Sequence, residues 1–262
     1  MDFTKKESFD FNDLIEIMKY LRAPDGCPWD RVQTHESIRS NFIEETYEVI
    51  EAIDNHDNDL MKEELGDVLL QVVFHSEMAA EDGAFDINDV VNDICKKLVV
   101  RHPHVFGDVK ADNAAEALKS WDDVKMQTKS HRKQSEAMDS VSKALPSLMR
   151  AAKIQQKAAK VGFDWENVDG PLDKIIEETN ELKEAVANNN SEAQAEELGD
   201  LLFSVVNVSR FLKVDSEKAL YDACDKFTER FRNMEKLAAE REIDIKSSSI
   251  QQLDSLWNEV KK

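Results

Sequence analysis

The sequence has few of the residues that form tight turns. Only 7 glycines and 5 prolines occur among its 262 residues, whereas average usage of about 12 % would give about 31. The glycines are all at least eight residues apart. This spacing excludes a Walker A loop and a dinucleotide-binding fingerprint, because both need closely spaced glycines. Such a scarcity of turn-forming residues favours long helices over many short strands.

The chain also lacks long apolar segments and paired cysteines. Its longest apolar stretches, such as residues 68–70, are far shorter than the roughly 20 residues that span a bilayer, and the first residues contain no apolar signal core. We therefore expect no membrane association and a cytoplasmic location. The cysteines, Cys27, Cys95 and Cys224, are far apart and odd in number. This pattern favours reduced thiols over a disulfide framework or a zinc site.

Positive charge is scarce relative to negative charge. The 34 Lys and Arg residues face 54 Asp and Glu residues, so the formal net charge is −20. A chain of this charge repels nucleic-acid backbones and anionic membranes, and we expect direct binding to neither. A small phosphorylated substrate held through a metal ion remains compatible with this charge.

Two blocks of the sequence occur twice. Residues 42–53, FIEETYEVIEAI, are identical at seven of twelve positions to residues 175–186, IIEETNELKEAV. Residues 63–74, EELGDVLLQVVF, are identical at eight of twelve positions to residues 196–207, EELGDLLFSVVN, and both pairs are 133 residues apart. Because the order is conserved, we infer a tandem duplication. We predict an N-terminal domain at 1–128, a polar linker at 129–144 and a C-terminal domain at 145–262.

The apolar residues of each copy recur at helical spacing. In the first block they lie on one side of a helical wheel: Ile43, Val49, Ile50 and Ile53. In the second block they do the same: Leu65, Val68, Leu69, Val72 and Val73. No convincing strand is found, so the predicted fold class is all-α.

The repeated blocks carry acidic residues at helical spacing. In the second copy, Glu178 and Glu181 share one helix face, and Glu197 and Asp200 share a face of the next helix. The loop between the helices is short, so the helices should be antiparallel neighbours whose acidic pairs can face each other. Four converging carboxylates repel one another unless a cation lies among them. The alternative for any single residue is a solvated surface glutamate.

The neighbours of these acids are apolar, which favours the metal-site interpretation. Gly199 lies inside the same helical pattern, where glycine costs about 1 kcal/mol relative to alanine. We interpret it as a close approach by a backbone or a ligand, or as a tight helix crossing. The first copy has the corresponding acids, so a second metal site is predicted there. These acids are Glu44, Glu45, Glu48, Glu64 and Asp67.

The available ligands select the type of metal. All six histidines precede residue 132, and the Glu-x-x-His motif of ferritin-like di-iron bundles does not occur. Ligand sets made only of oxygen favour hard cations, so Mg²⁺ is expected, with Mn²⁺ as a substitute. Mg²⁺ held by a few carboxylates usually also binds phosphate oxygens.

Two further features suit a nucleotide. Lys226 and Arg230 are four residues apart and could bind phosphates, although a salt-bridged surface pair is an equal alternative. Trp257 could stack on a base, although a tryptophan at helical spacing is more often part of a core. Both features recur in the first copy, as Lys97 with Arg101 and as Trp121.

Several motifs together resemble a known family. EExxE followed by EELGD occurs twice, with GCPWD near the start and RHPHVFGD in the middle. The chain resembles the tandem form of the MazG-type nucleoside triphosphate pyrophosphohydrolases. The resemblance implies all-α helical bundles completed by homodimerisation. It also implies Mg²⁺-dependent cleavage between the α- and β-phosphates, giving a nucleoside monophosphate and pyrophosphate, in a housekeeping role on the nucleotide pool.

The resemblance also implies roles for individual residues. Glu178, Glu181, Glu197 and Asp200 would bind Mg²⁺, and Glu177 would help to orient the attacking water or a second metal ion. The implied phosphate contacts are Lys174, Lys226 and Arg230, and Trp257 would lie beside the base or ribose. In the first copy Glu45, Glu48, Glu64 and Asp67 would form the second metal site.

The first copy departs from this pattern near the expected phosphate contacts. Asn41 stands where the second copy has Lys174, and Pro103 should end the helix shortly after Arg101. We therefore hypothesise that the second copy is the main active site. Three alternatives remain open: a non-catalytic acidic helical scaffold, a carboxylate-bridged metal-binding bundle, and a phosphatase that removes the terminal phosphate.

Overall fold

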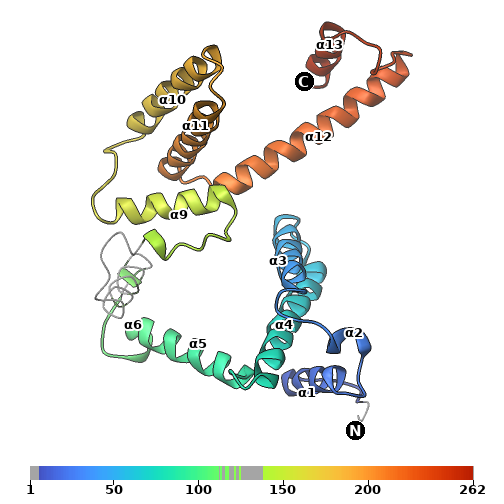
Figure 1. Ribbon diagram of the computed structural model, residues 1–262, viewed down its shortest axis with the longest axis vertical. Helices are drawn as coiled ribbons and strands as arrows, with labels where there is room; N and C mark the ends of the chain where they lie inside the picture. Colours follow the sequence, from blue (N-terminus) through green and yellow to red (C-terminus); the bar gives the residue numbers. More distant parts are fainter. Residues whose placement is uncertain are drawn as a thin grey trace. The chain divides into compact units, whose positions relative to one another are not determined.

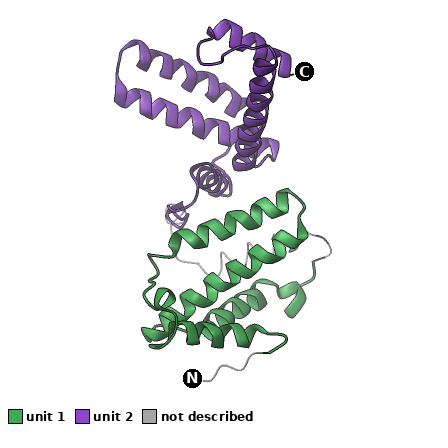
Figure 2. Ribbon diagram, turned by 90° about the vertical axis from the view of Figure 1, so that its right-hand side faces the viewer, with its two compact units in different colours: residues 1–130 green, residues 131–262 purple. Residues whose placement is uncertain are grey.

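The protein is entirely helical in the part of the chain that the structure describes. The computed structural model describes residues 6–111, 113, 116, 117, 121, 124 and 138–261, and all regular elements in these residues are α-helices. The chain divides into two compact units, residues 1–130 and 131–262 (Figure 2). The all-α prediction is confirmed. Of the predicted linker 129–144, residues 129–137 lie outside the described residues.

Unit 1, residues 1–130, contains a long antiparallel helix pair with shorter helices around it (Figure 1). Its helices are α1 (Phe11–Arg22), α2 (Pro28–Arg31), α3 (Arg39–Asp54), α4 (Asn58–Glu81), α5 (Ile87–Arg101) and α6 (Pro103–Phe106). The pair α3–α4 has the most extensive contact in the unit, and α4 also packs against α1 and α5.

Local sequence determines where these helices begin and end. The side chain of Asp10 accepts hydrogen bonds from the backbone N–H groups of Asn12 and Asp13 and so caps α1. Asp57 caps α4 in the same way. Helix α5 ends at Arg101, as the sequence predicts, because Pro103 cannot continue it and instead begins α6.

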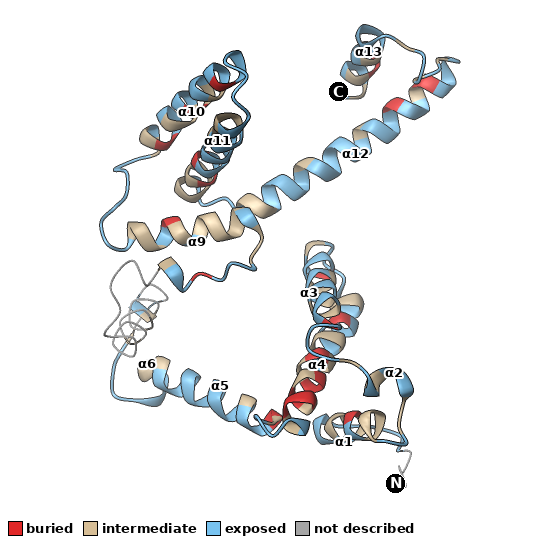
Figure 3. Cartoon of the chain, in the orientation of Figure 1, coloured by how far each residue is buried: buried red, intermediate tan, exposed pale blue. Residues whose placement is uncertain are grey.

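The core of unit 1 lies around the C-terminal half of α4, where buried residues are concentrated (Figure 3). It is formed by Met18, Ile38, Val73, Phe74, Met78 and Ile87. The N-terminal half of α4 is more exposed, and Glu64 is its buried residue. Helix α4 therefore has an apolar half that stabilises the unit and an acidic half that faces α3.

Unit 2, residues 131–262, repeats the antiparallel pair as α10–α11. Its helices are α9 (Ser147–Ala159), α10 (Asp169–Ala187), α11 (Ser191–Leu212), α12 (Ser216–Glu240) and α13 (Ile250–Val260). Helix α9 packs against α11 and α12, and α13 packs against α12. A small core lies where α12 and α13 meet, and it is formed by Met234 and Ala238 of α12 and Leu256 of α13.

None of the described helices is both long enough and apolar enough to cross a bilayer. Cys27, Cys95 and Cys224 are all free thiols, with Cys27 half-buried and the other two exposed.

Candidate metal centres and substrate contacts

The acidic residues of the repeated blocks lie, in each unit, on two antiparallel helices that pack against each other. Three residues, 188–190, connect α10 to α11, and the same number, 55–57, connect α3 to α4. Such short connections keep the two helices adjacent. Acidic residues spaced by three on each helix therefore point into the space between the helices, as the sequence predicts.

In unit 2 the acids form two overlapping groups that share Glu178. One group is Glu177, Glu178 and Glu181, and the other is Glu178, Glu197 and Asp200; within each, one carboxylate oxygen per residue lies within 4.8 Å of the others. Glu178 is the buried member, with 4 % of its surface exposed. The four predicted metal ligands are thus brought together around one buried carboxylate.

Lys174 neutralises this buried carboxylate. Its ammonium group forms ion pairs with Glu178, one turn further along α10, and with Glu177 at 3.0 Å. The hydrogen bond from Lys174 holds the pKa of Glu178 below its usual value, and the same bond raises the pKa of Lys174. Glu178 is therefore a buried anion, which metal coordination requires.

The carboxyl groups on either side of Glu178 are perturbed in the opposite direction. Burial, followed by the neighbouring Glu178, raises the pKa of Glu181. Burial and the charge of Glu178 likewise raise the pKa of Glu197. Burial is the larger cause of both shifts, and the proximity of Glu178 is the next. A cation among the oxygens would relieve the repulsive part.

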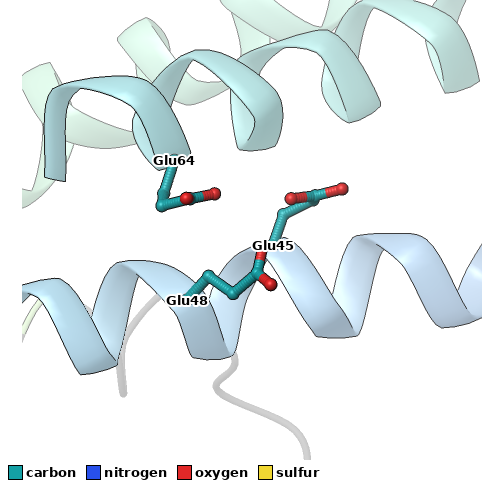
Figure 4. Close-up of side chains that lie close together, drawn as sticks. All are labelled: Glu45, Glu48 and Glu64. Carbon is teal, nitrogen blue, oxygen red and sulfur yellow. The ribbon is translucent and has the colours of Figure 1, made fainter. Parts of the chain in front are cut away.

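Unit 1 contains a corresponding group of three acids. Glu45 and Glu48 extend from α3 and Glu64 from α4 into the space between the helices (Figure 4), with one carboxylate oxygen of each within 4.8 Å of the others. Burial and then the neighbouring carboxyls raise the pKa of both Glu45 and Glu64. Asp67 acts electrostatically on both residues but is not a member of the close group. Glu44 is exposed.

Both groups fit a hard divalent cation. Their donor atoms are all carboxylate oxygens, which Mg²⁺ and Mn²⁺ prefer. Each group contains one buried glutamate, Glu178 or Glu64. Their oxygens lie within 4.8 Å of one another, so nearby carboxylates repel one another and add to the effect of burial in raising the pKa of Glu64 and of Glu197.

The predicted substrate contacts lie on other helices. Lys226 is exposed and Arg230 half-buried on α12. Trp257 is half-buried on α13, and its ring centroid is 4.9 Å from that of Phe227, which lies between the two basic residues in sequence. The structure therefore brings the basic pair and the tryptophan to one region.

Within unit 2, that region is separate from the acidic residues. Among the described helices, α13 packs against α12 alone, and α12 has only a small contact with α11. Trp257 thus lies beside α12 and not beside the acids of α10 and α11. The sequence-derived roles of Lys226, Arg230 and Trp257 remain predictions.

Unit 1 also places an arginine beside a tryptophan. The guanidinium carbon of Arg101 lies 5.3 Å from the centroid of the Trp121 ring, and the ring of His102 is 4.7 Å from the same tryptophan. Both copies therefore position a tryptophan against the helix that carries the basic pair.

One interpretation of the helix glycines requires correction. A Cβ atom added at Gly199 would meet nothing within 4 Å in the described chain, and the same is true of Gly66. A tight helix crossing within the unit therefore does not explain Gly199. The space beside it is open in the described chain.

The ion pair between Lys174 and Glu178 was missed by the sequence reasoning. The resemblance implied a phosphate contact for Lys174, and nothing in that implication linked it to Glu178. The signal was nonetheless present, because a lysine four residues before a glutamate on a helix is at ion-pair spacing.

Comparison with known proteins matches both units to one domain family. The family model for the MazG nucleotide pyrophosphohydrolase domain matches residues 33–106 and 169–234. The chain is 49 % identical over 251 residues to the nucleoside triphosphate pyrophosphohydrolase/pyrophosphatase MazG of Thermotoga maritima, covering 96 % of this chain and 95 % of the relative. It is 42 % identical over 254 residues to the nucleoside triphosphate pyrophosphohydrolase of Escherichia coli strain K12, covering 95 % and 96 %.

Proposed function

Because the chain belongs to the MazG nucleotide pyrophosphohydrolase family, we propose that it hydrolyses nucleoside triphosphates between the α- and β-phosphates. The products are a nucleoside monophosphate and pyrophosphate, and the role is housekeeping of the nucleotide pool in the cytoplasm. The observation that carries the proposal is the pair of acidic groups that share buried Glu178. Carboxylates gathered around a buried glutamate are better explained as a site for a metal-bound polyphosphate than as solvated surface residues.

The acidic residues of unit 2 would hold the metal ion. Glu178, Glu181, Glu197 and Asp200 are the proposed ligands, with Mg²⁺ as the natural ion and Mn²⁺ as a substitute. A bound divalent ion neutralises phosphate charge and lowers the pKa of bound water. Glu177, exposed at the edge of the group, would accept a hydrogen bond from the attacking water and orient it.

Basic residues would bind the phosphates. Lys174 lies against the acidic group and can reach a phosphate held there. Lys226 and Arg230 would bind the remaining phosphate oxygens, and Trp257 would lie beside the base or ribose. Since α13 packs on α12 and not on α10 or α11 within unit 2, we propose that these contacts come from a second copy of the chain.

Unit 2 is proposed as the main active site and unit 1 as a second metal site. The two units have corresponding acids, but the position of Lys174, which is ion-paired with Glu178 in unit 2, is occupied by Asn41 in unit 1. The metal ligands in unit 1 would be Glu45, Glu48, Glu64 and Asp67.

A homodimer would cover apolar surface that each unit by itself leaves exposed. Three corresponding positions of the two repeats carry large apolar residues that are at least 40 % exposed. They are Ile43, Leu65 and Leu69 in unit 1, and Ile176, Leu198 and Leu202 in unit 2. These residues lie at corresponding positions of the antiparallel helix pair in each unit. Exposed apolar residues that gather in this way suit an interaction surface, and we propose a second copy of the chain as the partner.

Product identification tests the proposed reaction. The protein would be incubated with a panel of nucleoside triphosphates and Mg²⁺, with and without EDTA, and the products separated. We expect a monophosphate and pyrophosphate in equal amounts, and no reaction with EDTA. Release of orthophosphate with a diphosphate would identify a phosphatase instead. No turnover of any nucleotide would favour the acidic scaffold, and bound iron in the purified protein would favour a carboxylate-bridged metal bundle.

Sedimentation velocity tests the proposed dimer. The double variant Leu198→Glu/Leu202→Glu places two charges on one face of α11, and we expect it to sediment more slowly than the wild type. An unchanged sedimentation coefficient, or a wild type that is monomeric at micromolar concentration, would contradict the dimer.

A further inference from the structure

The ammonium group of Lys174 lies against the carboxylates of unit 2. We call these carboxylates the unit 2 acidic group, and they belong to Glu177, Glu178, Glu181, Glu197 and Asp200. The ammonium group is in contact with buried Glu178 and lies 3.0 Å from a carboxylate oxygen of Glu177. The side chain of Glu178 is 6 % exposed and that of Lys174 is 34 % exposed. The lysine therefore supplies the charge compensation that this buried carboxylate needs.

Unit 1 has an uncharged residue at the position that corresponds to Lys174. Asn41 stands 133 residues before Lys174 and so occupies its position in the repeat. In the described part of unit 1, no lysine or arginine is ion-paired with Glu45, Glu48 or Glu64. The two repeats thus have similar carboxylate oxygens but differ in charge. A lysine is ion-paired with the acidic group of unit 2, and none is ion-paired with the described group of unit 1.

A divalent cation and Lys174 compete for Glu178. The carboxylate oxygen that contacts the ammonium group is no longer fully available as a metal ligand, and a +2 ion a few ångströms from an ammonium group is repelled by it. A polyphosphate removes this conflict, because its oxygens bind both the metal ion and the lysine.

We propose that Lys174 is the resident counter-ion of the unit 2 acidic group, and that it transfers from Glu178 to a substrate phosphate when metal and nucleotide bind together. The inference rests on the proposed function and adds an order of events to it. Unit 2 binds metal weakly alone and tightly with nucleotide, whereas unit 1 binds metal without nucleotide. By linkage, the metal tightens nucleotide binding in unit 2 by the same factor.

Mn²⁺ binding provides a readout that is independent of turnover. Free Mn²⁺ would be followed by electron paramagnetic resonance in the full chain carrying Glu45→Gln/Glu64→Gln, which removes two of the four proposed unit 1 ligands. Binding would be measured with and without a nucleoside triphosphate analogue that has a methylene bridge between the α- and β-phosphates. Adding Lys174→Asn introduces the residue of unit 1. We expect it to tighten Mn²⁺ binding without analogue about tenfold and to reduce the effect of the analogue by a similar factor.

The reciprocal exchange tests the same idea in unit 1. In the full chain carrying Glu178→Gln/Glu197→Gln, adding Asn41→Lys should weaken Mn²⁺ binding about tenfold. Lys218→Met is the matched control for the loss of Lys174. Lys218 is also ion-paired with an acid four residues later, Asp222 at 2.9 Å, but this pair lies outside the acidic groups. The control variant should leave Mn²⁺ binding unchanged.

The outcomes separate this inference from the proposed function. If Lys174→Asn leaves the Mn²⁺ affinity unchanged, or leaves the effect of the analogue undiminished, the counter-ion role of Lys174 is wrong. The proposed metal site would still stand. If Mn²⁺ does not bind unit 2 with or without the analogue, and Glu178→Gln makes no difference, the metal site itself is wrong. Lys174→Met, which keeps the side-chain length, would repeat the test if the asparagine variant unfolds.

Discussion

Arg210 ties the loop that precedes α10 to the end of α11. Its guanidinium group donates hydrogen bonds to both carboxylate oxygens of Asp164, one of them at 2.9 Å, and Asn207 holds the same guanidinium at 2.8 Å. The loop begins at the end of α9 and leads directly into the helix that carries Glu178. This two-pronged contact therefore helps to set how α10 enters the acidic site.

Removing the acidic partner should lower stability in a pH-dependent way. The hydrogen bonds from Arg210 hold the pKa of Asp164 below its usual value. The stabilisation is therefore present above the ordinary pKa of ~4 and is lost as the pH falls through the lower folded-state value. We expect Asp164→Asn to reduce the free energy of unfolding by about 1 kcal/mol at pH 7. Urea unfolding at a series of pH values should show the difference from wild type disappearing below pH ~4.

The two acidic groups should differ in their importance for activity. Glu178→Gln keeps the size of the buried side chain but removes its charge, and we expect kcat to fall by at least about 100-fold. Glu45→Gln is the matched change in unit 1, and we expect it to leave most of the activity. Steady-state rates of pyrophosphate release would measure both. A greater loss from Glu45→Gln would contradict the assignment of unit 2 as the main active site.

Replacing either of two helix glycines by alanine should stabilise the protein. Gly66 and Gly199 lie in helix interiors, and an added Cβ would meet nothing within 4 Å in the described chain. Gly66→Ala and Gly199→Ala should therefore each raise the free energy of unfolding by about 0.5–1 kcal/mol. Thermal unfolding monitored by circular dichroism would measure this effect.

Activity should distinguish the two glycines even though stability does not. Gly199 lies between Glu197 and Asp200, and the open space beside it suits the substrate of the proposed main site. We expect Gly199→Ala to lower kcat/KM and Gly66→Ala to leave it nearly unchanged. Equal activity in both variants would mean that no substrate approaches Gly199.

Corresponding core residues should stabilise the two units to a similar extent. Val73 in α4 and Val206 in α11 are 133 residues apart, and they are 1 % and 0 % exposed. Truncation of either to alanine removes two buried methyl groups, so we expect each change to cost about 2 kcal/mol. Differential scanning calorimetry would measure the losses. A loss well below this value in one unit would indicate that its core can collapse around the cavity.

Much of the site could be predicted because it depends on short-range spacing. Glu178 and Glu181 share a helix face whenever their segment is helical, and a three-residue connection makes the next helix an antiparallel neighbour. The positions of Lys226, Arg230 and Trp257 relative to the acids could not be predicted in this way. They depend on the path of α12 and on the packing of α13, which involve contacts far apart in sequence.

The amino-acid sequence by itself determined the helical class, the duplication and the pairing of acidic residues on helix faces, because these follow from periodicity and from loop length. Only the tertiary structure decided that Glu178 is the buried carboxylate shared by two groups, and that Trp257 of α13 packs beside Phe227 of α12. Burial depends on which helices meet and how deeply each side chain lies between them, and no local pattern of residues specifies that depth.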